Sequence, residues 1–178
     1  MVVPIRSFRA GKGRLAGVLS DDARAALARS MAEGVLAAAA PLPIYVVTSD
    51  DDVVALACER GAKVVADPGS LNGAAGVGRA AAAADGYAMT IIAHADLAEP
   101  RPFAWVADFH GVTIVPDRHG GGTNVMALPA TAPFTFAYGE GSRFRHEAEA
   151  AARGLPWRVV EDASLGWDVD EPDDLPRR

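Results

Sequence analysis

The feature that most constrains the fold is a repeated alternation of short apolar runs with longer segments of helical character. The apolar runs are continuous, which is the pattern of strands buried on both faces. Strands are expected at MVVPI (1–5), IYVVTS (44–49), 63–66, MTIIA (89–93), VTIV (112–115), VMALP (125–129) and WRVV (157–160). This alternation predicts an α/β fold with a mostly parallel central sheet covered by helices on both faces.

The helices between these strands have recognisable start and stop signals. Ser20 is a candidate N-cap for the alanine-rich segment that follows it. Gly61 and Gly154 are expected to end helices, because glycine readily adopts the left-handed conformation found there. The expected helices are 21–40, 52–60, 72–84, 102–109 and 142–153. With no internal repeat or linker, residues 1–178 are expected to form one domain.

Charge and composition limit the partners. The chain has 17 Lys and Arg against 23 Asp and Glu, a net charge of −6, so it has no broad basic surface for nucleic acid. No apolar run approaches the roughly 20 residues needed to span a bilayer. The single cysteine, Cys58, is expected to be a buried small hydrophobe. We expect a cytoplasmic protein without nucleic-acid or membrane partners, and the oligomeric state stays open, a homo-oligomer included.

The first candidate site is the basic loop after the first strand. Ligands of open α/β sheets gather at the carboxyl ends of the strands. There, GKGRL (11–15) places Lys12 and Arg14 among glycines, which suits a phosphate chain approached by backbone N–H groups. It is not a Walker A loop, because no Ser or Thr follows the lysine in the required frame. A solvated basic loop is the alternative interpretation.

Three aspartates form the second candidate. Asp96 ends MTIIAHAD, and Asp168 and Asp170 stand two apart in WDVD. Residues i and i+2 of an extended segment face the same way, so both carboxylates could reach one hard cation such as Mg²⁺. Asp96 would arrive from a neighbouring strand. The alternative is an ordinary acidic tail, since this pattern is short and EPDD follows it.

Two glycine-containing stretches form the third candidate. The glycines of PDRHGGGTN (116–124) lie between two strand-like runs, where they are costly in chain entropy, so the backbone must need them. YGEGSRFRH (138–146) carries Ser142, Arg145 and His146 at the start of an expected helix, which suits an anionic group. An ordinary N-cap at Ser142 is the alternative. No ligand-like spacing relates the other histidines, which are interpreted as structural or surface residues: His94, His110 and His119.

Taken together and in this order, these stretches resemble the 2-phospho-L-lactate guanylyltransferase family, which includes the phosphoenolpyruvate guanylyltransferases of coenzyme F420 biosynthesis. The matching stretches span nearly the whole chain: VVPIRSFRAGKGRL, LNGA, HADL, PDRHGGGTNVMAL, FAYGEGSRFRHEAEA and DVDEPDDL. PDRHGGGTN and YGEGSRFRH are the most specific of them. The resemblance implies a three-layer Rossmann-like nucleotidyltransferase fold that transfers GMP from GTP to a small phosphorylated three-carbon acid and releases pyrophosphate.

The resemblance also implies roles for individual residues. Lys12 and Arg14 would bind the triphosphate and act in catalysis together with Asp96, and Asn72 would lie near the nucleotide. The Mg²⁺ ligands would be Asp96, Asp168 and Asp170. The acceptor would bind at Gly122, Thr123, Ser142, Arg145 and His146.

Two departures from the family pattern bear on the acceptor. Arg6 stands where a lysine is common after the first strand, and Ala98 replaces the usual proline after the metal-site aspartate. These departures leave three candidate acceptors: 2-phospho-L-lactate, phosphoenolpyruvate and 3-phosphoglycerate.

One alternative function is another small nucleotidyltransferase, of the molybdenum-cofactor guanylyltransferase type, which gives no obvious reason for YGEGSRFRH. The other is a non-catalytic nucleotide or phosphometabolite binder, against which the three intact aspartates weigh.

Overall fold

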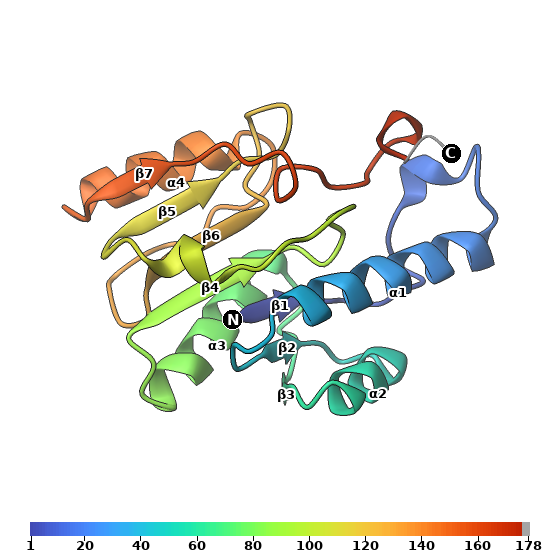
Figure 1. The fold of residues 1–178 in the computed structure, drawn as a ribbon, viewed down its shortest axis with the longest axis horizontal. Coiled ribbons are helices and arrows are strands. Elements are labelled where there is room, and N and C mark those ends of the chain that lie inside the picture. Colours follow the sequence, from blue (N-terminus) through green and yellow to red (C-terminus); the bar gives the residue numbers. More distant parts are fainter. Residues whose placement is uncertain (176–178) are drawn as a thin grey trace.

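The computed structural model describes residues 1–175 and is built on a seven-stranded sheet in the order β3-β2-β1-β4-β6-β5-β7 (Figure 1). Each predicted strand forms within a residue or two of its expected bounds. The strands are β1 (Val2–Pro4), β2 (Tyr45–Val47), β3 (Lys63–Val65), β4 (Met89–Ala93), β5 (Val112–Val115), β6 (Val125–Pro129) and β7 (Trp157–Val159).

The sheet is mostly parallel, as predicted, with one reversed strand. β1 pairs in parallel with β2 and β4, β2 with β3, and β5 with β7. β6 is antiparallel to both β4 and β5. The carboxyl ends of β4 and β5 therefore lie at the same edge as the amino end of β6, and residues 116–124 connect β5 to β6 there.

Helices cover both faces of the sheet, which gives the predicted three layers. The helices are α1 (Asp21–Ala38), α2 (Asp51–Glu59), α3 (Leu71–Ala84) and α4 (Ser142–Ala152). α1 and α2 contribute to one apolar cluster, and α3 and α4 to another. Val3 and Ile91 point into the first cluster, whereas their neighbours Val2 and Ile92 point into the second. Because both faces are covered, the central strands are largely apolar, with buried threonines at Thr90 in β4 and Thr113 in β5.

Three local predictions are corrected. The helix expected over 102–109 is a short 3₁₀ helix, η2 (Ala104–Ala107), since the prolines before it disfavour a longer α-helix and the connection is short. α4 is capped by Gly141 in the left-handed conformation, with a φ of 70°, and not by Ser142. Cys58 is exposed, because it lies on the outer side of α2. Ser20 caps α1 as predicted, its side chain accepting from the N–H of Ala23.

Within residues 1–175, no helix combines the length and apolar character needed to cross a membrane.

Candidate active site

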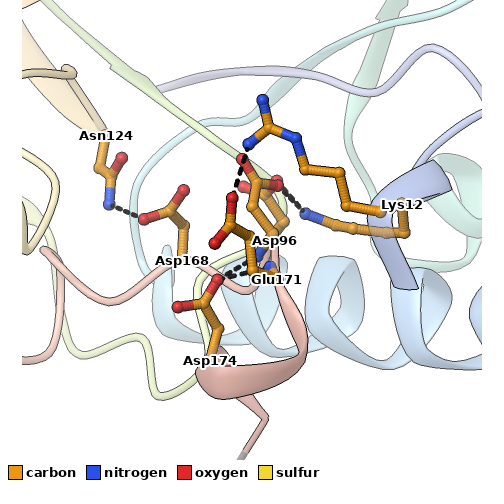
Figure 2. A network of polar contacts seen from close by, with 8 residues as sticks. Lys12, Asp96, Asn124, Asp168, Glu171 and Asp174 are labelled. Carbon is orange, nitrogen blue, oxygen red and sulfur yellow. Dashed lines mark hydrogen bonds and ion pairs between the residues drawn. The ribbon is translucent and has the colours of Figure 1, made fainter. Parts of the chain in front are cut away.

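Lys12 lies at the centre of the candidate site (Figure 2). Its ammonium is 2.5 Å from Asp96 Oδ2 and 2.8 Å from Asp170 Oδ1, and its side chain is only 7% exposed. Lys12 has a φ of 62°, which is uncommon for a residue other than glycine. It directly precedes the 3₁₀ helix η1 (Gly13–Leu15), so this backbone conformation starts the turn that carries the lysine.

The segment around Asp168 is brought to Asp96 by backbone pairing. Leu97 and Asp168 form an antiparallel bridge, and the N–H of Val169 donates to the carbonyl of Asp96 at 3.1 Å. The chain end thus returns to the carboxyl end of β4. The structure therefore brings together all three aspartates that the resemblance assigned to the metal.

The three carboxylates have different electrostatic surroundings. Burial of Asp96 opposes its ionisation, but the charges of Lys12 and His94 outweigh burial, so the pKa of Asp96 is lowered. For Lys12, burial opposes the charged form, and the two carboxylates prevail to raise its pKa. The pKa of Asp168 is raised, first by burial and then by the charges of Asp96 and Asp170. Asp96 and Asp170 therefore both act on Asp168, and the three aspartates form one acidic cluster.

Two residues that the sequence analysis did not select hold this cluster. Asn124 donates from Nδ2 to Asp168 Oδ1 at 3.1 Å. The buried Asp174 accepts from the backbone N–H groups of Asp170 and Glu171, at 2.8 and 2.6 Å (Figure 2). Asp174 also forms an ion pair with Arg118. Both residues stand in stretches that the sequence analysis quotes, and this position is the signal that could have identified them. Asn124 ends PDRHGGGTN, and Asp174 lies in the acidic EPDD.

The donor set suits Mg²⁺, although it is not assembled as a metal site. Hard oxygen ligands are what Mg²⁺ prefers, and Asp96 Oδ1 is buried without a hydrogen-bond partner in residues 1–175. In that part of the chain, no three acidic, His or Cys side chains form a ready metal group. The assignment of Asp96, Asp168 and Asp170 to the metal therefore stays a prediction. The carboxylates repel one another, so Asp96 and Asp170 share Lys12, whereas Asp168 bonds to Asn124.

A cavity opens beside these charges. It has a volume of about 380 Å³ and is lined by Lys12, His94, Asp96 and Asp170 together with the loop after β1. A second cavity of about 220 Å³ shares Arg6 and Leu71 with the first. The two form a groove along the carboxyl ends of β1 and β2, where the predicted ligand site lies.

Arg14 and Asn72, the other two residues assigned to the nucleotide, are not in the lining of either cavity. Arg14 is exposed, and its Nη1 is 3.2 Å from Glu171 Oε1. Asn72, in the first turn of α3, accepts at Oδ1 from the N–H of Tyr138 at 2.7 Å. Asn72 therefore connects the groove to the loop that precedes α4.

Thr123, Ser142 and His146 form a buried polar network. Ser142 Oγ donates to Thr123 Oγ1 at 3.3 Å, and Thr123 Oγ1 lies 3.1 Å from His146 Nδ1. The N–H of Ala137 donates to His146 Nε2 at 3.0 Å, so neutral His146 carries its proton on Nδ1 and donates to Thr123. The network joins the two glycine-containing stretches, which the sequence predicted to meet.

Arg145 holds the loop in front of α4. Its guanidinium donates to the carbonyls of Ala137 at 3.0 Å, Glu140 at 2.5 Å and Tyr138 at 3.4 Å. In this structure the side chain is thus a clamp on residues 137–140.

Gly122 is required by a close approach inside its own loop. Asp117 accepts from the N–H of Gly121 at 3.0 Å and from the N–H of Gly122 at 2.9 Å. A Cβ added at Gly122 would lie 2.4 Å from Asp117 Oδ2. The anion that the glycines approach here is therefore the carboxylate of Asp117.

The buried His146 gives a prediction for stability against pH. Burial, followed by the charges of Arg145 and His94, lowers its pKa from 6.5 to about 4. Below pH 6.5 this histidine is protonated in the unfolded chain but stays neutral in the folded chain until the pH approaches 4. The free energy of unfolding that is present above pH 6.5 is therefore lost as the pH falls towards 4. The loss is expected to reach about 3 kcal/mol.

Urea unfolding across this pH window tests the expectation. His146→Gln keeps an acceptor for Ala137 and should flatten the pH dependence, whereas the exposed His110→Gln should follow the wild type. An unchanged slope in His146→Gln would assign the acid sensitivity to other groups.

Comparison with known proteins decides the family. Residues 1–177 match the family model described as "Guanylyl transferase CofC like". The chain belongs to this family. It is 35% identical to the phosphoenolpyruvate guanylyltransferase of Sphaerobacter thermophilus, over 98% of this chain and 89% of that protein. It is also 35% identical to the 3-phospho-D-glycerate guanylyltransferase of Phenylobacterium zucineum, over 97% of this chain and 86% of that protein.

Solved structures support the fold. A putative nucleotide-diphospho-sugar transferase from Desulfovibrio desulfuricans G20 superposes with a TM-score of 0.75 at 18% identity, over 96% of this chain and 81% of that one. Glucosyl-3-phosphoglycerate synthase from Mycobacterium tuberculosis, in complex with Mg²⁺ and UDP, has a TM-score of 0.60 at 17% identity, over 90% and 67% of the two chains. The family members are guanylyltransferases, and the Rossmann-like nucleotidyltransferase fold is the predicted one.

Proposed function

We propose that this guanylyltransferase moves GMP from GTP to the phosphate of a small phosphorylated three-carbon acid, as a step of coenzyme F420 biosynthesis. The observation that carries the proposal is the convergence of Lys12 and three aspartates at one end of the groove, in a chain of this family. The acceptor is phosphoenolpyruvate, 3-phosphoglycerate or 2-phospho-L-lactate, which share a carboxylate and a phosphate on three carbons.

GTP would lie in the groove along β1 and β2. Lys12 would bind the triphosphate and Arg14 would neutralise it from the exposed side, with Asn72 near the nucleotide. Lys12 holds Asp96 and Asp170 in the structure, so its ammonium is already positioned at the acidic cluster. The Lys12 side chain has enough rotatable bonds for its ammonium to leave a carboxylate and bind a phosphate oxygen instead.

The acceptor would bind beside the acidic cluster, where the two glycine-containing stretches meet. Gly122 and Arg145 would shape its pocket through the loops that they hold, 116–124 and 137–140. Thr123, Ser142 and His146 would fix these loops against each other and so shape the pocket for the phosphate or carboxylate. This assignment is supported by their mutual hydrogen bonds at 3.1 and 3.3 Å.

The reaction is an in-line displacement. An oxygen of the acceptor phosphate forms a bond to the α-phosphorus of GTP, and the bond from that phosphorus to the bridging oxygen breaks, with its electron pair leaving on pyrophosphate. The acceptor phosphate is already ionised at neutral pH, so no general base is required. The chain's own task is to hold two anions together and to offset their charge. Mg²⁺, bound by Asp96, Asp168 and Asp170, would supply Lewis-acid stabilisation of the phosphoryl oxygens.

The experiment combines the protein and Mg²⁺ with GTP, ATP or CTP and each of the three acids. We expect pyrophosphate release with GTP and at least one acid, in equal amount to a GMP–acid conjugate identified by mass. Excess chelator should stop the reaction. Nucleotide binding without pyrophosphate release would instead indicate a non-catalytic binder, and pyrophosphate release only with another acceptor would indicate another nucleotidyltransferase.

A further inference from the structure

Besides Asp96 Oδ1, two buried polar atoms near the site have no hydrogen-bond partner in the described part of the chain: Nε2 of His94 and Oη of Tyr138. Buried polar groups in folded proteins are nearly always paired, because an unpaired one loses its bonds to water without replacement. Because His94 also lines the cavity, this pair of atoms requires an explanation. Within residues 1–175, neither of these two atoms takes part in the hydrogen bonds of the acidic cluster or of the Thr123 network.

The two side chains connect the cavity to the buried network. His94 follows β4 directly, lines the 380 Å³ cavity and is anchored by its backbone N–H, which donates to the carbonyl of Asn124 at 2.9 Å. The rings of His94 and Tyr138 are 5.4 Å apart, and those of Tyr138 and His146 are 4.9 Å apart. They form a continuous row from the acidic cluster to the network that joins the glycine-containing stretches.

Packing explains the ring of Tyr138 but not its hydroxyl. The ring stacks on Phe136 at 6.1 Å and an interplanar angle of 16°, and meets His146 edge-on. Phenylalanine would make the same contacts, as Phe134 and Phe136 do in the same segment. A buried hydroxyl in an aromatic cluster lowers stability unless it has a partner, so the hydroxyl is best explained by a ligand.

Several other donors around this junction are already engaged. The ammonium of Lys12 bonds to Asp96 and Asp170. Ser142 and His146 donate to Thr123, and Arg145 donates to three backbone carbonyls. Within residues 1–175, Nε2 of His94 and Oη of Tyr138 are buried groups beside this junction that can donate and have no partner.

We propose that Nε2 of His94 and Oη of Tyr138 donate hydrogen bonds to the phosphorylated acid and hold its phosphate for attack. This inference rests on the proposed function, because it names contacts for that acceptor. It assigns the acceptor phosphate to the space between Asp96 and the network. It also gives a substrate contact to His94, which the sequence alone placed among structural or surface histidines.

Tyr138→Phe is the sharpest test, because it removes one oxygen and keeps the ring. We expect kcat/KM for the acid to fall about 10- to 100-fold, the usual effect of losing a hydrogen bond to a charged group. KM for GTP should stay within about twofold, and the melting temperature should rise or stay unchanged, since an unpaired buried hydroxyl is removed. Tyr87→Phe, at an exposed tyrosine outside the cavity lining, is the matched control.

The hydrogen bond from His94 is tested by one substitution that removes the donor and a second that restores one. His94→Ala should lose acceptor kcat/KM to a similar extent, and His94→Gln, whose amide can donate from a nearby position, should recover part of it. Higher stability of Tyr138→Phe with unchanged acceptor kcat/KM would overturn the proposal, and so would equal values for His94→Ala and the wild type.

Calorimetric titration of phosphoenolpyruvate and 3-phosphoglycerate into each variant separates this inference from the proposed function. If the wild type binds an acid but releases no pyrophosphate with any nucleotide, the proposed function fails. Weaker binding by Tyr138→Phe would then still support the contact. If the wild type binds no acid, or both variants bind as tightly as it does, the inference fails.

Discussion

Asp96→Asn is expected to lower the turnover of GTP and acid roughly 1000-fold, because the metal charge that this residue would hold is worth several kcal/mol in the transition state. Asp96 is half-buried, with one oxygen on Lys12 and the other buried and unpaired within residues 1–175. Asparagine has almost the same volume but carries no charge. The loss should therefore appear in kcat, with the fold retained.

Steady-state pyrophosphate release at saturating Mg²⁺ measures the effect, with circular dichroism as the check on folding. Asp170→Asn should show a large loss of the same kind. Asp173→Asn is the matched control, since Asp173 is exposed in the same acidic tail. Titration with Mn²⁺ followed by electron paramagnetic resonance gives a readout independent of turnover. Near-wild-type kcat and Mn²⁺ affinity in Asp96→Asn would remove this residue from the proposed metal ligands.

Gly122→Ala is expected to reduce acceptor kcat/KM about 100-fold while leaving GTP affinity within about twofold. The new Cβ would lie 2.4 Å from Asp117 Oδ2, so the carboxylate must leave the N–H groups of Gly121 and Gly122 or the loop must move. A displacement of about 1 Å beside the reacting groups is enough for a 100-fold effect. Lost hydrogen bonds should also lower the free energy of unfolding by about 1–3 kcal/mol.

Gly121→Ala is the matched control, because a Cβ at Gly121 meets nothing within 4 Å and its φ lies outside the left-handed region. Urea unfolding, GTP calorimetry and acceptor kinetics compare the two variants. If Gly122→Ala weakens GTP binding and leaves saturation by the acid unchanged, this loop serves the nucleotide and the two ends of the site are exchanged. Equal behaviour of both variants would show that the contact with Asp117 does not shape the site.

Much of the fold was predictable from local pattern. The apolar runs at β1, β4 and β5 are buried on both faces, and no other environment suits such continuous runs in short strands. Ser20 capped α1 as expected, because an N-cap depends on residues within one turn of each other. The direction of β6 was not readable from VMALP, since a buried antiparallel strand has the same apolar pattern as a parallel one.

The candidate site was predictable as a set of residues and not as an arrangement. The sequence determined that Lys12, the three aspartates and the two glycine-containing stretches follow strands, and strand ends in an α/β sheet share an edge. Partner choice was decided by tertiary structure. Lys12 meets Asp96 and Asp170 across 84 and 158 residues, and Asn124 meets Asp168 across 44. Sequence spacing carries no signal at such separations, because strand order and the returning chain end set these distances.

The glycines and His94 show most clearly what the sequence determined and what only the tertiary structure decided. The glycines in PDRHGGGTN indicated that something approaches this backbone closely. The tertiary structure decided that the approaching group is the carboxylate of Asp117. For His94, position after β4 was known, but its burial, its contact with Tyr138 and its unpaired Nε2 were not. Whether a polar atom has a partner depends on every segment packed around it, so only the folded chain could decide it.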